Sequence, residues 1–203
     1  MREERNEPSA VPGQKSGKQI DVDASVILSD ETTAREFFRI AMDRLRTVSE
    51  WARISANPTA GFQLTDPLGN LVNRKISKGD LIRIDIPGPP NTEGDGYDWV
   101  EVEHEEITST PDRDEYAFRV RPTQSPLSAG DETAHFYSGE STSTFSVTRE
   151  KNVVTAAVYD RNAKPNTEAD TVTGKVRDVL VGAAGIVAFS GMQWENLVKG
   201  IVK

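Results

Sequence analysis

The chain has 203 residues, with 24 Lys plus Arg against 32 Asp plus Glu, so its formal net charge at pH 7 is -8. A surface that is negative on average repels phosphate backbones, and nucleic acid is therefore excluded as the expected partner. The sequence has no cysteine, which excludes disulfides, thiolate metal ligands and thiol catalysis.

The amino-terminal residues 1–18 are charged, contain Pro, Gly and Ser, and have almost no large apolar side chain. This composition predicts a flexible tail in front of a single domain that covers residues 19–203. The segment lacks the apolar core of a signal peptide, and the apolar run Val179–Phe189 is shorter than the roughly 20 residues of a membrane-spanning helix. We therefore expect a cytoplasmic protein without a membrane span.

The first regular elements follow this tail. Residues 20–28 alternate between apolar and polar side chains, which predicts a half-buried strand. Across residues 33–54 the apolar positions recur at helical spacing, which predicts one helix, or two short ones with a break near Thr47 to Trp51. Pro58 ends this stretch, because the residue before a proline is pushed out of the helical region.

Short extended segments separated by turn residues make up the middle of the chain. Six of them are predicted to be strands, and the last two form an antiparallel hairpin: residues 61–65, 81–86, 97–107, 115–121, 144–148 and 153–159. In the segment 115–121, Arg119 and Arg121 lie on the outer side and can pair with a row of glutamates on 97–107. Residues 122–143 are polar and rich in Ser and Thr, which predicts a long loop.

The longest apolar periodicity lies at the end of the chain and predicts an amphipathic helix over residues 167–203. Thr167 and Asp170 form a capping box at its start. The small residues 182–185 have three open explanations: close approach of another backbone, a bend, or a low wall over a cavity.

This order of elements, strand, helical stretch, six strands and one long helix, resembles the helix-grip fold of the START-like superfamily, also called SRPBCC or polyketide cyclase-like proteins. The resemblance covers Gln19–Lys203 and is one of element order, with a faint sequence echo in Val48–Trp51, where the family often has a tryptophan. It implies an α+β fold in which a curved antiparallel sheet of about seven strands wraps around the long carboxy-terminal helix. It also implies a cavity between sheet and helix that holds a small apolar ligand such as a lipid, a sterol or an aromatic polyketide.

If the resemblance holds, the ligand-binding residues are the inward-facing side chains of the strands together with the small patch of the helix: Ile84, Val102, His104, Tyr116, Phe118, Ala156, Val158, Gly182, Ala183 and Gly185. The catalytic residues of the family differ between its subgroups, so none is carried over to this chain. No cofactor is expected.

The two histidines, His104 and His135, are too few for a multi-histidine metal site, and we expect no metal. Alternation places His104 on the apolar face with Val100 and Val102, where it is a candidate acid–base residue; a hydrogen-bonded core or rim histidine is the simpler interpretation. The same alternation sends Glu103 and Glu105 to the wet face. His135 lies in the polar loop and is expected to be solvated.

Three functions remain open. The first is a binding module for a small apolar ligand, of lipid or aromatic type, between the sheet and the helix. The second is an interaction or assembly module that uses the Gly/Ala face of the helix, with a homo-oligomer as one outcome. The third is an enzyme of the cyclase or hydratase kind with His104 as its acid–base residue, although no hydrolase or phosphate-loop motif is present.

Overall fold

The computed structural model describes residues 7–55, 60–86, 91, 93–128, 130, 132–166 and 183–203, and of residues 183–189 the backbone only. Seven strands form one sheet in the order β1-β7-β6-β5-β4-β3-β2, and every neighbouring pair is antiparallel. The strands are β1 (Lys18–Ile27), β2 (Gly61–Thr65), β3 (Leu81–Asp85), β4 (Asp98–Ser109), β5 (Arg113–Pro122), β6 (Thr142–Glu150) and β7 (Val153–Ala163). All seven predicted strands are therefore confirmed.

The helical stretch after β1 is broken where the sequence indicated. Helix α1 (Glu31–Arg46) is capped by Asp30, whose Oδ1 accepts a hydrogen bond from the Thr33 amide at 2.8 Å. A single 3₁₀ turn, η1 (Val48–Glu50), then leads into the short helix α2 (Trp51–Ile54). The break re-aims the chain so that the Trp51 side chain is buried against the sheet.

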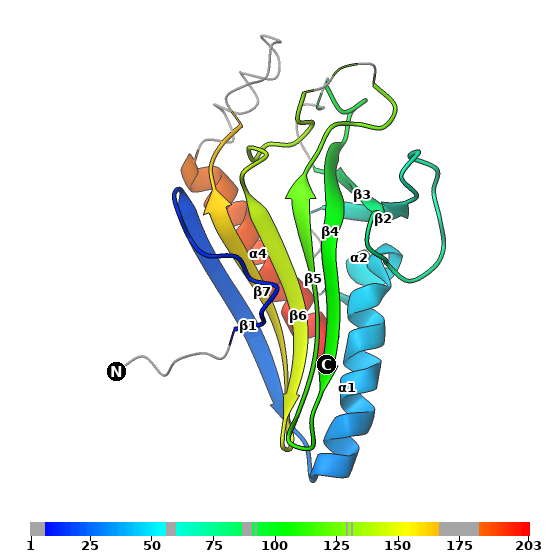
Figure 1. Ribbon diagram of the computed structural model, residues 1–203, viewed down its shortest axis with the longest axis vertical. Helices are drawn as coiled ribbons and strands as arrows, with labels where there is room; N and C mark the ends of the chain where they lie inside the picture. Colours follow the sequence, from blue (N-terminus) through cyan, green and yellow to red (C-terminus); the bar gives the residue numbers. More distant parts are fainter. Residues whose placement is uncertain are drawn as a thin grey trace.

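Helix α4 (Ala183–Ile201) lies behind the sheet in Figure 1, on the same face as α1 and α2. It packs on β1 and β7 and touches α1 and α2. The predicted start of this helix at Thr167, with its capping box, lies outside the described residues. We call the face of the sheet that carries the helices the inner face and the opposite one the outer face. This arrangement confirms the predicted α+β helix-grip fold.

The core lies between the inner face and the helices. Alternation on the central strands sends Tyr116, Phe118 and Val120 inward, as predicted, where they meet the buried side of α1. Trp51 stands in the middle of this core, and its Nε1 donates a hydrogen bond to the Leu45 carbonyl at 3.0 Å.

The outer face is polar and is crossed by residues 7–17, drawn in dark blue in front of the sheet in Figure 1. The Ala10 amide donates to Glu106 at 2.9 Å, and the amides of Lys15 and Ser16 donate to Asn162 Oδ1 at 2.7 and 3.1 Å. Part of the expected tail is therefore bound to the outer face of the sheet. The division of the chain at residue 18 stays a prediction.

The predicted charge pairing on the outer face is confirmed. Arg121 Nε lies 2.7 Å from Glu103 Oε2, and Arg119 binds the same carboxylate. Among the helices in the described ranges, none has the length and apolar character needed to cross a membrane.

Candidate ligand pocket

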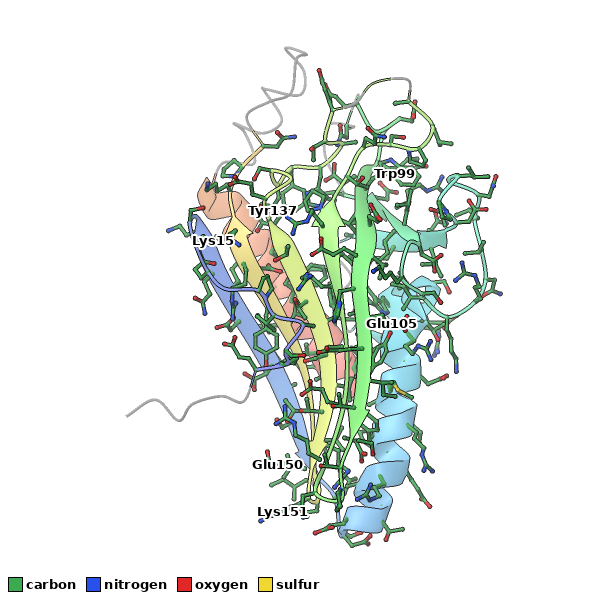
Figure 2. All side chains as sticks on the ribbon, in the orientation of Figure 1. Lys15, Trp99, Glu105, Tyr137, Glu150 and Lys151 are labelled. Atoms are coloured by element: carbon green, nitrogen blue, oxygen red, sulfur yellow. The ribbon has the colours of Figure 1, made fainter. Side chains whose placement is uncertain are left out.

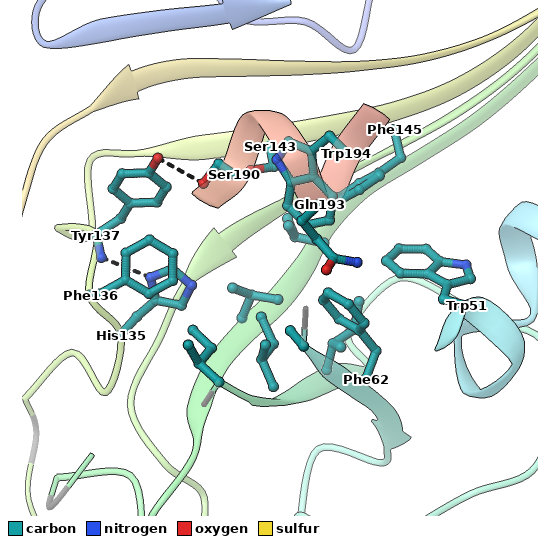
Figure 3. Close-up of a pocket in the computed structure, with 16 residues that line it drawn as sticks. Trp51, Phe62, His135, Phe136, Tyr137, Ser143, Phe145, Ser190, Gln193 and Trp194 are labelled. Atoms are coloured by element: carbon teal, nitrogen blue, oxygen red, sulfur yellow. Dashed lines mark hydrogen bonds between the residues drawn. The ribbon is translucent and has the colours of Figure 1, made fainter. Parts of the chain in front are cut away.

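A pocket opens between the inner face of the sheet and the middle of α4 (Figure 3). It has a cavity volume of about 40 Å³, and its empty space including the mouth is about 520 Å³. Sixteen residues from five strands, two helices and three connecting segments line it: Trp51, Ala60, Phe62, Ile82, Ile84, Ile86, Val100, Val120, His135, Phe136, Tyr137, Ser143, Phe145, Ser190, Gln193 and Trp194.

The floor of the pocket is aliphatic and follows directly from strand alternation. Ile82 lies opposite Val100 across β3 and β4, and Ile84 lies opposite Phe62 across β3 and β2. Because these pairs point to the same side of the sheet, they give a continuous apolar surface under the cavity.

Four aromatic side chains form the wall. The ring centroids of Trp51 and Phe62 are 5.3 Å apart, those of Trp51 and Phe145 5.1 Å, and those of Phe145 and Trp194 5.0 Å with perpendicular planes. Trp194 Nε1 is fixed by a hydrogen bond to Asp160 Oδ2 at 3.1 Å. Contacts within the wall therefore hold these rings in place around the apolar space.

One end of the pocket is polar. Tyr137 and Ser190 share a hydrogen bond of 3.0 Å between their hydroxyl groups, and the Tyr137 amide donates to His135 Nδ1 at 2.9 Å. Figure 3 shows these side chains together at the side of the pocket away from Trp51, whereas the amide of Gln193 points toward Trp51. Since Nδ1 of His135 accepts a hydrogen bond, the ring is the neutral tautomer with its proton on Nε2. Burial, helped by the nearby charge of Asp160, raises the pKa of Tyr137, so its hydroxyl stays protonated.

Behind this polar end lies a buried carboxyl group. Asp160 on β7 is 1% exposed, and burial raises its pKa to about 6, while hydrogen bonds from Ser143 and Trp194 work in the opposite direction. Its Oδ1 has no hydrogen-bond partner within the part of the chain that the structure describes. The neighbouring Arg161 binds Asp21 and Glu7 at the outer face. The inner side of β7 therefore carries a negative charge at neutral pH.

Only some of the predicted ligand-binding residues come near this pocket. Ile84 lines it. Five others are buried in the adjoining core, at the packed end of the sheet: Val102, Tyr116, Phe118, Ala156 and Val158. Gly182 lies outside the described residues, and Ala183 and Gly185 belong to the first turn of α4, of which the structure describes the backbone. Ligand contact by any of these residues stays a prediction.

The prediction that His104 shares the apolar face with Val102 is wrong. A β-bulge between these two residues shifts the register, so that His104 lies opposite Arg119 and on the outer face. Its Nε2 lies 3.2 Å from Glu106 Oε2, and its side chain is 39% exposed. The bulge turns Glu105 inward for the same reason, where it accepts a hydrogen bond from the Tyr116 hydroxyl at 2.9 Å. The expected wet position of Glu105 is therefore also wrong.

The prediction that His135 is solvated is wrong as well, because the long loop folds back over the sheet. His135 is 6% exposed, and its ring stacks on Phe136 at 4.3 Å between centroids. Three consecutive rings, His135 to Tyr137, in an otherwise polar segment were the sequence signal for this burial. Across the described ranges, no group of three His, Asp or Glu side chains comes together in the way a metal site requires.

No family model matches the chain, and no curated protein does. Among solved structures, a hypothetical protein from Helicobacter pylori matches with 14% identity over 97% of each chain and a TM-score of 0.43. Major latex-like protein 151 from Panax ginseng matches with 15% identity over 85% of this chain and 98% of that one, at a TM-score of 0.33. Truncated norcoclaurine synthase from Thalictrum flavum matches with 9% identity over 91% and 96%, at a TM-score of 0.34.

Proposed function

We propose that the protein binds a small apolar molecule, of lipid or aromatic type, in the pocket between the sheet and α4. The observation that carries this proposal is the aromatic wall of Trp51, Phe62, Phe145 and Trp194, which surrounds empty space above an aliphatic floor. Elsewhere on the inner face the same kinds of side chain are packed against the helices. Apolar surface that faces a cavity is stabilised when a ligand removes it from water.

The size of the pocket limits how a ligand fits. A cavity volume of about 40 Å³ has room for a few water molecules, since each needs roughly 10–15 Å³ by this kind of measure. The 520 Å³ of empty space includes open solvent at the mouth, so only part of it is enclosed by the protein. The ligand therefore places one ring or one acyl end among the aromatic residues and extends into the mouth.

Two valines on β4 provide a matched test. Val100 lines the pocket, whereas Val102, two residues further on the same face, is buried in the core. The test is a titration of the wild-type protein, Val100→Phe and Val102→Phe with Nile red, an uncharged apolar dye. The emission of the dye gives its affinity for each protein. The added ring at position 100 fills the pocket, so dye affinity falls by about tenfold or more, or about 1.4 kcal/mol.

Val102→Phe instead overpacks the core, which lowers the free energy of unfolding by roughly 1–3 kcal/mol but leaves dye affinity near the wild-type value. Circular dichroism checks that each variant is folded. The proposal is overturned if the wild-type protein does not take up the dye, or if Val100→Phe binds it as tightly as the wild type does.

An enzymatic role for His104 within this pocket is not supported, because the bulge places its imidazole on the other side of the sheet. The assembly role of the Gly/Ala face stays a prediction, since residues 182–185 include positions outside the described ranges.

A further inference from the structure

The charge of the polar end indicates which apolar ligands the pocket accepts, provided that the proposed function is correct. Among the described lining residues there is no lysine or arginine. The His135 ring is neutral with its proton on Nε2, because its Nδ1 accepts a hydrogen bond from the Tyr137 amide. A carboxylate entering this end would lose its hydration without gaining a positive partner from these residues, which is costly in an apolar site.

Asp160 adds a negative charge to the same end. It lies directly behind two lining residues, Ser143 and Trp194, which both direct hydrogen-bond donors at it. The Ser143 hydroxyl is hydrogen-bonded to Asp160, and Ser143 itself lines the pocket. The Oδ1 atom of Asp160 is buried and has no hydrogen-bond partner in the described part of the chain. A hydrogen-bond donor from a ligand is the group that this arrangement lacks.

The aromatic wall favours the same kind of ligand. The faces of Trp and Phe rings carry negative potential and attract an organic cation within about 6 Å of the ring centre. Phe62, Phe145 and Trp194 line the same pocket, with Phe62 and Trp194 centroids 6.0 Å apart. A cation in this pocket would therefore have aromatic rings around it, with the Asp160 carboxylate behind Ser143 and Trp194.

We propose that the ligand is an apolar amine, bound with its hydrocarbon body in the aromatic part of the pocket and its ammonium group at the polar end beside Ser143 and Asp160. The expected affinity order for molecules with one common hydrocarbon body is amine first, alcohol second and carboxylate last. The alcohol donates a hydrogen bond without charge, and the carboxylate is repelled.

Three naphthalene derivatives test this order: 1-naphthylmethylamine, 1-naphthalenemethanol and 1-naphthoate, each competing with bound Nile red at pH 7.5. We expect the amine to displace the dye with about tenfold higher affinity than the alcohol, and the alcohol with about tenfold higher affinity than the carboxylate. Carboxylate affinity equal to or above that of the alcohol overturns the inference, and so does dye displacement by none of the three. If the dye itself does not bind, the proposed function fails first, which separates the two failures.

Asp160→Asn identifies the source of the preference. The variant keeps an oxygen to accept the Trp194 hydrogen bond but removes the charge, so the amine loses its tenfold advantage while alcohol affinity stays within about twofold. An unchanged amine advantage in the folded variant overturns the role of Asp160.

A pH comparison on the wild-type protein gives the same information without a substitution, should the variant not fold. The charged and titratable groups of the described residues that interact electrostatically with Asp160 are Tyr137, Asp21 and Arg161. The pKa of Asp160 is about 6, so lowering the pH from 8 to 5 neutralises this carboxyl group while the amine stays protonated. The ratio of amine to alcohol affinity falls about tenfold between these pH values, and a constant ratio contradicts the inference.

Discussion

The two ends of α4 meet the sheet and the other helices in different ways. At the carboxy-terminal end, Leu197, Val198 and Ile201 are almost fully buried in the core, and Gly200 lies against the backbone of α2. Nearer the amino terminus, in the middle of the helix, Ser190 and Trp194 border the pocket. Figure 2 shows the long axis along which the inner face extends, from Tyr137 near one end to Glu150 and Lys151 at the other. The same inward alternation thus gives a packed core at one end and a lined cavity at the other.

The difference lies in what covers the strands. Helix α1 packs its buried side, including Phe38, Ala41 and Leu45, on β5, β6 and β7. Over β2, β3 and β4 the cover is α2, the loop around His135 and the first described side chains of α4, which leave space between them. Strand patterns decide which side chains point inward, and the helices decide which of those are packed and which face a cavity.

Two phenylalanines of the same aromatic group test this contrast with the largest expected effect. Phe118 is fully buried in the core, whereas Phe62 lines the pocket. Phe118→Ala leaves an enclosed void and lowers the free energy of unfolding by about 3–5 kcal/mol. Phe62→Ala joins its void to the pocket, which water can enter, so we expect a loss about 1 kcal/mol smaller. Urea denaturation measures both.

Dye binding separates the same two variants. Nile red affinity falls in Phe62→Ala, because the wall loses a ring, and is retained in Phe118→Ala under conditions where that variant is folded. Equal loss of dye affinity in both variants would mean that the packed and open regions act as one unit.

Strand alternation and turn residues predicted all seven strands and, except beyond Val102 on β4, the side chains that point inward, because these signals are local. The bulge between Val102 and His104 was not predictable, since alternation contains no sign of an inserted residue and one such residue reverses every later side chain. This is why His104 and Glu105 were each assigned to the wrong face.

The pocket itself was harder to predict than the strands. Ile84 and Tyr116 both point inward, and no feature of either strand shows that the first faces a cavity and the second faces α1. That distinction depends on how far each helix extends over the sheet. Tyr137 reaches the pocket because its loop folds back over the sheet. Its hydroxyl then meets that of Ser190, which is 53 residues away in the sequence.

The second prediction concerns Asp160, the buried carboxyl group behind the pocket. Burial raises the pKa of Asp160 from 3.8 to about 6, so between these pH values the folded protein holds a proton that the unfolded chain releases. The contribution of this group therefore favours folding below about pH 4 and is lost as the pH rises through 6. Two pKa units correspond to roughly 3 kcal/mol.

Comparison with Asp160→Asn isolates this contribution from the other acids. The difference in the free energy of unfolding, variant minus wild type, should increase by roughly 3 kcal/mol between pH 3.5 and pH 7.5. Urea denaturation at four pH values measures it. A difference that is constant with pH would show that Asp160 is solvated, and that the open end carries no buried charge.

Two glycines of α4 give the smallest effects and the most direct comparison of its ends. A Cβ on Gly200 would lie 2.2 Å from the Ile54 carbonyl oxygen, whereas a Cβ on Gly191, near the pocket, would meet nothing within 4 Å. Gly200→Ala forces α4 away from α2 and costs roughly 1–3 kcal/mol. Gly191→Ala reduces the conformational freedom of the unfolded chain at this position. The substitution therefore stabilises the protein by up to about 1 kcal/mol. Thermal unfolding of the two variants should move in opposite directions, and a loss of stability in both would mean that α4 is as closely packed beside the pocket as it is beside α2.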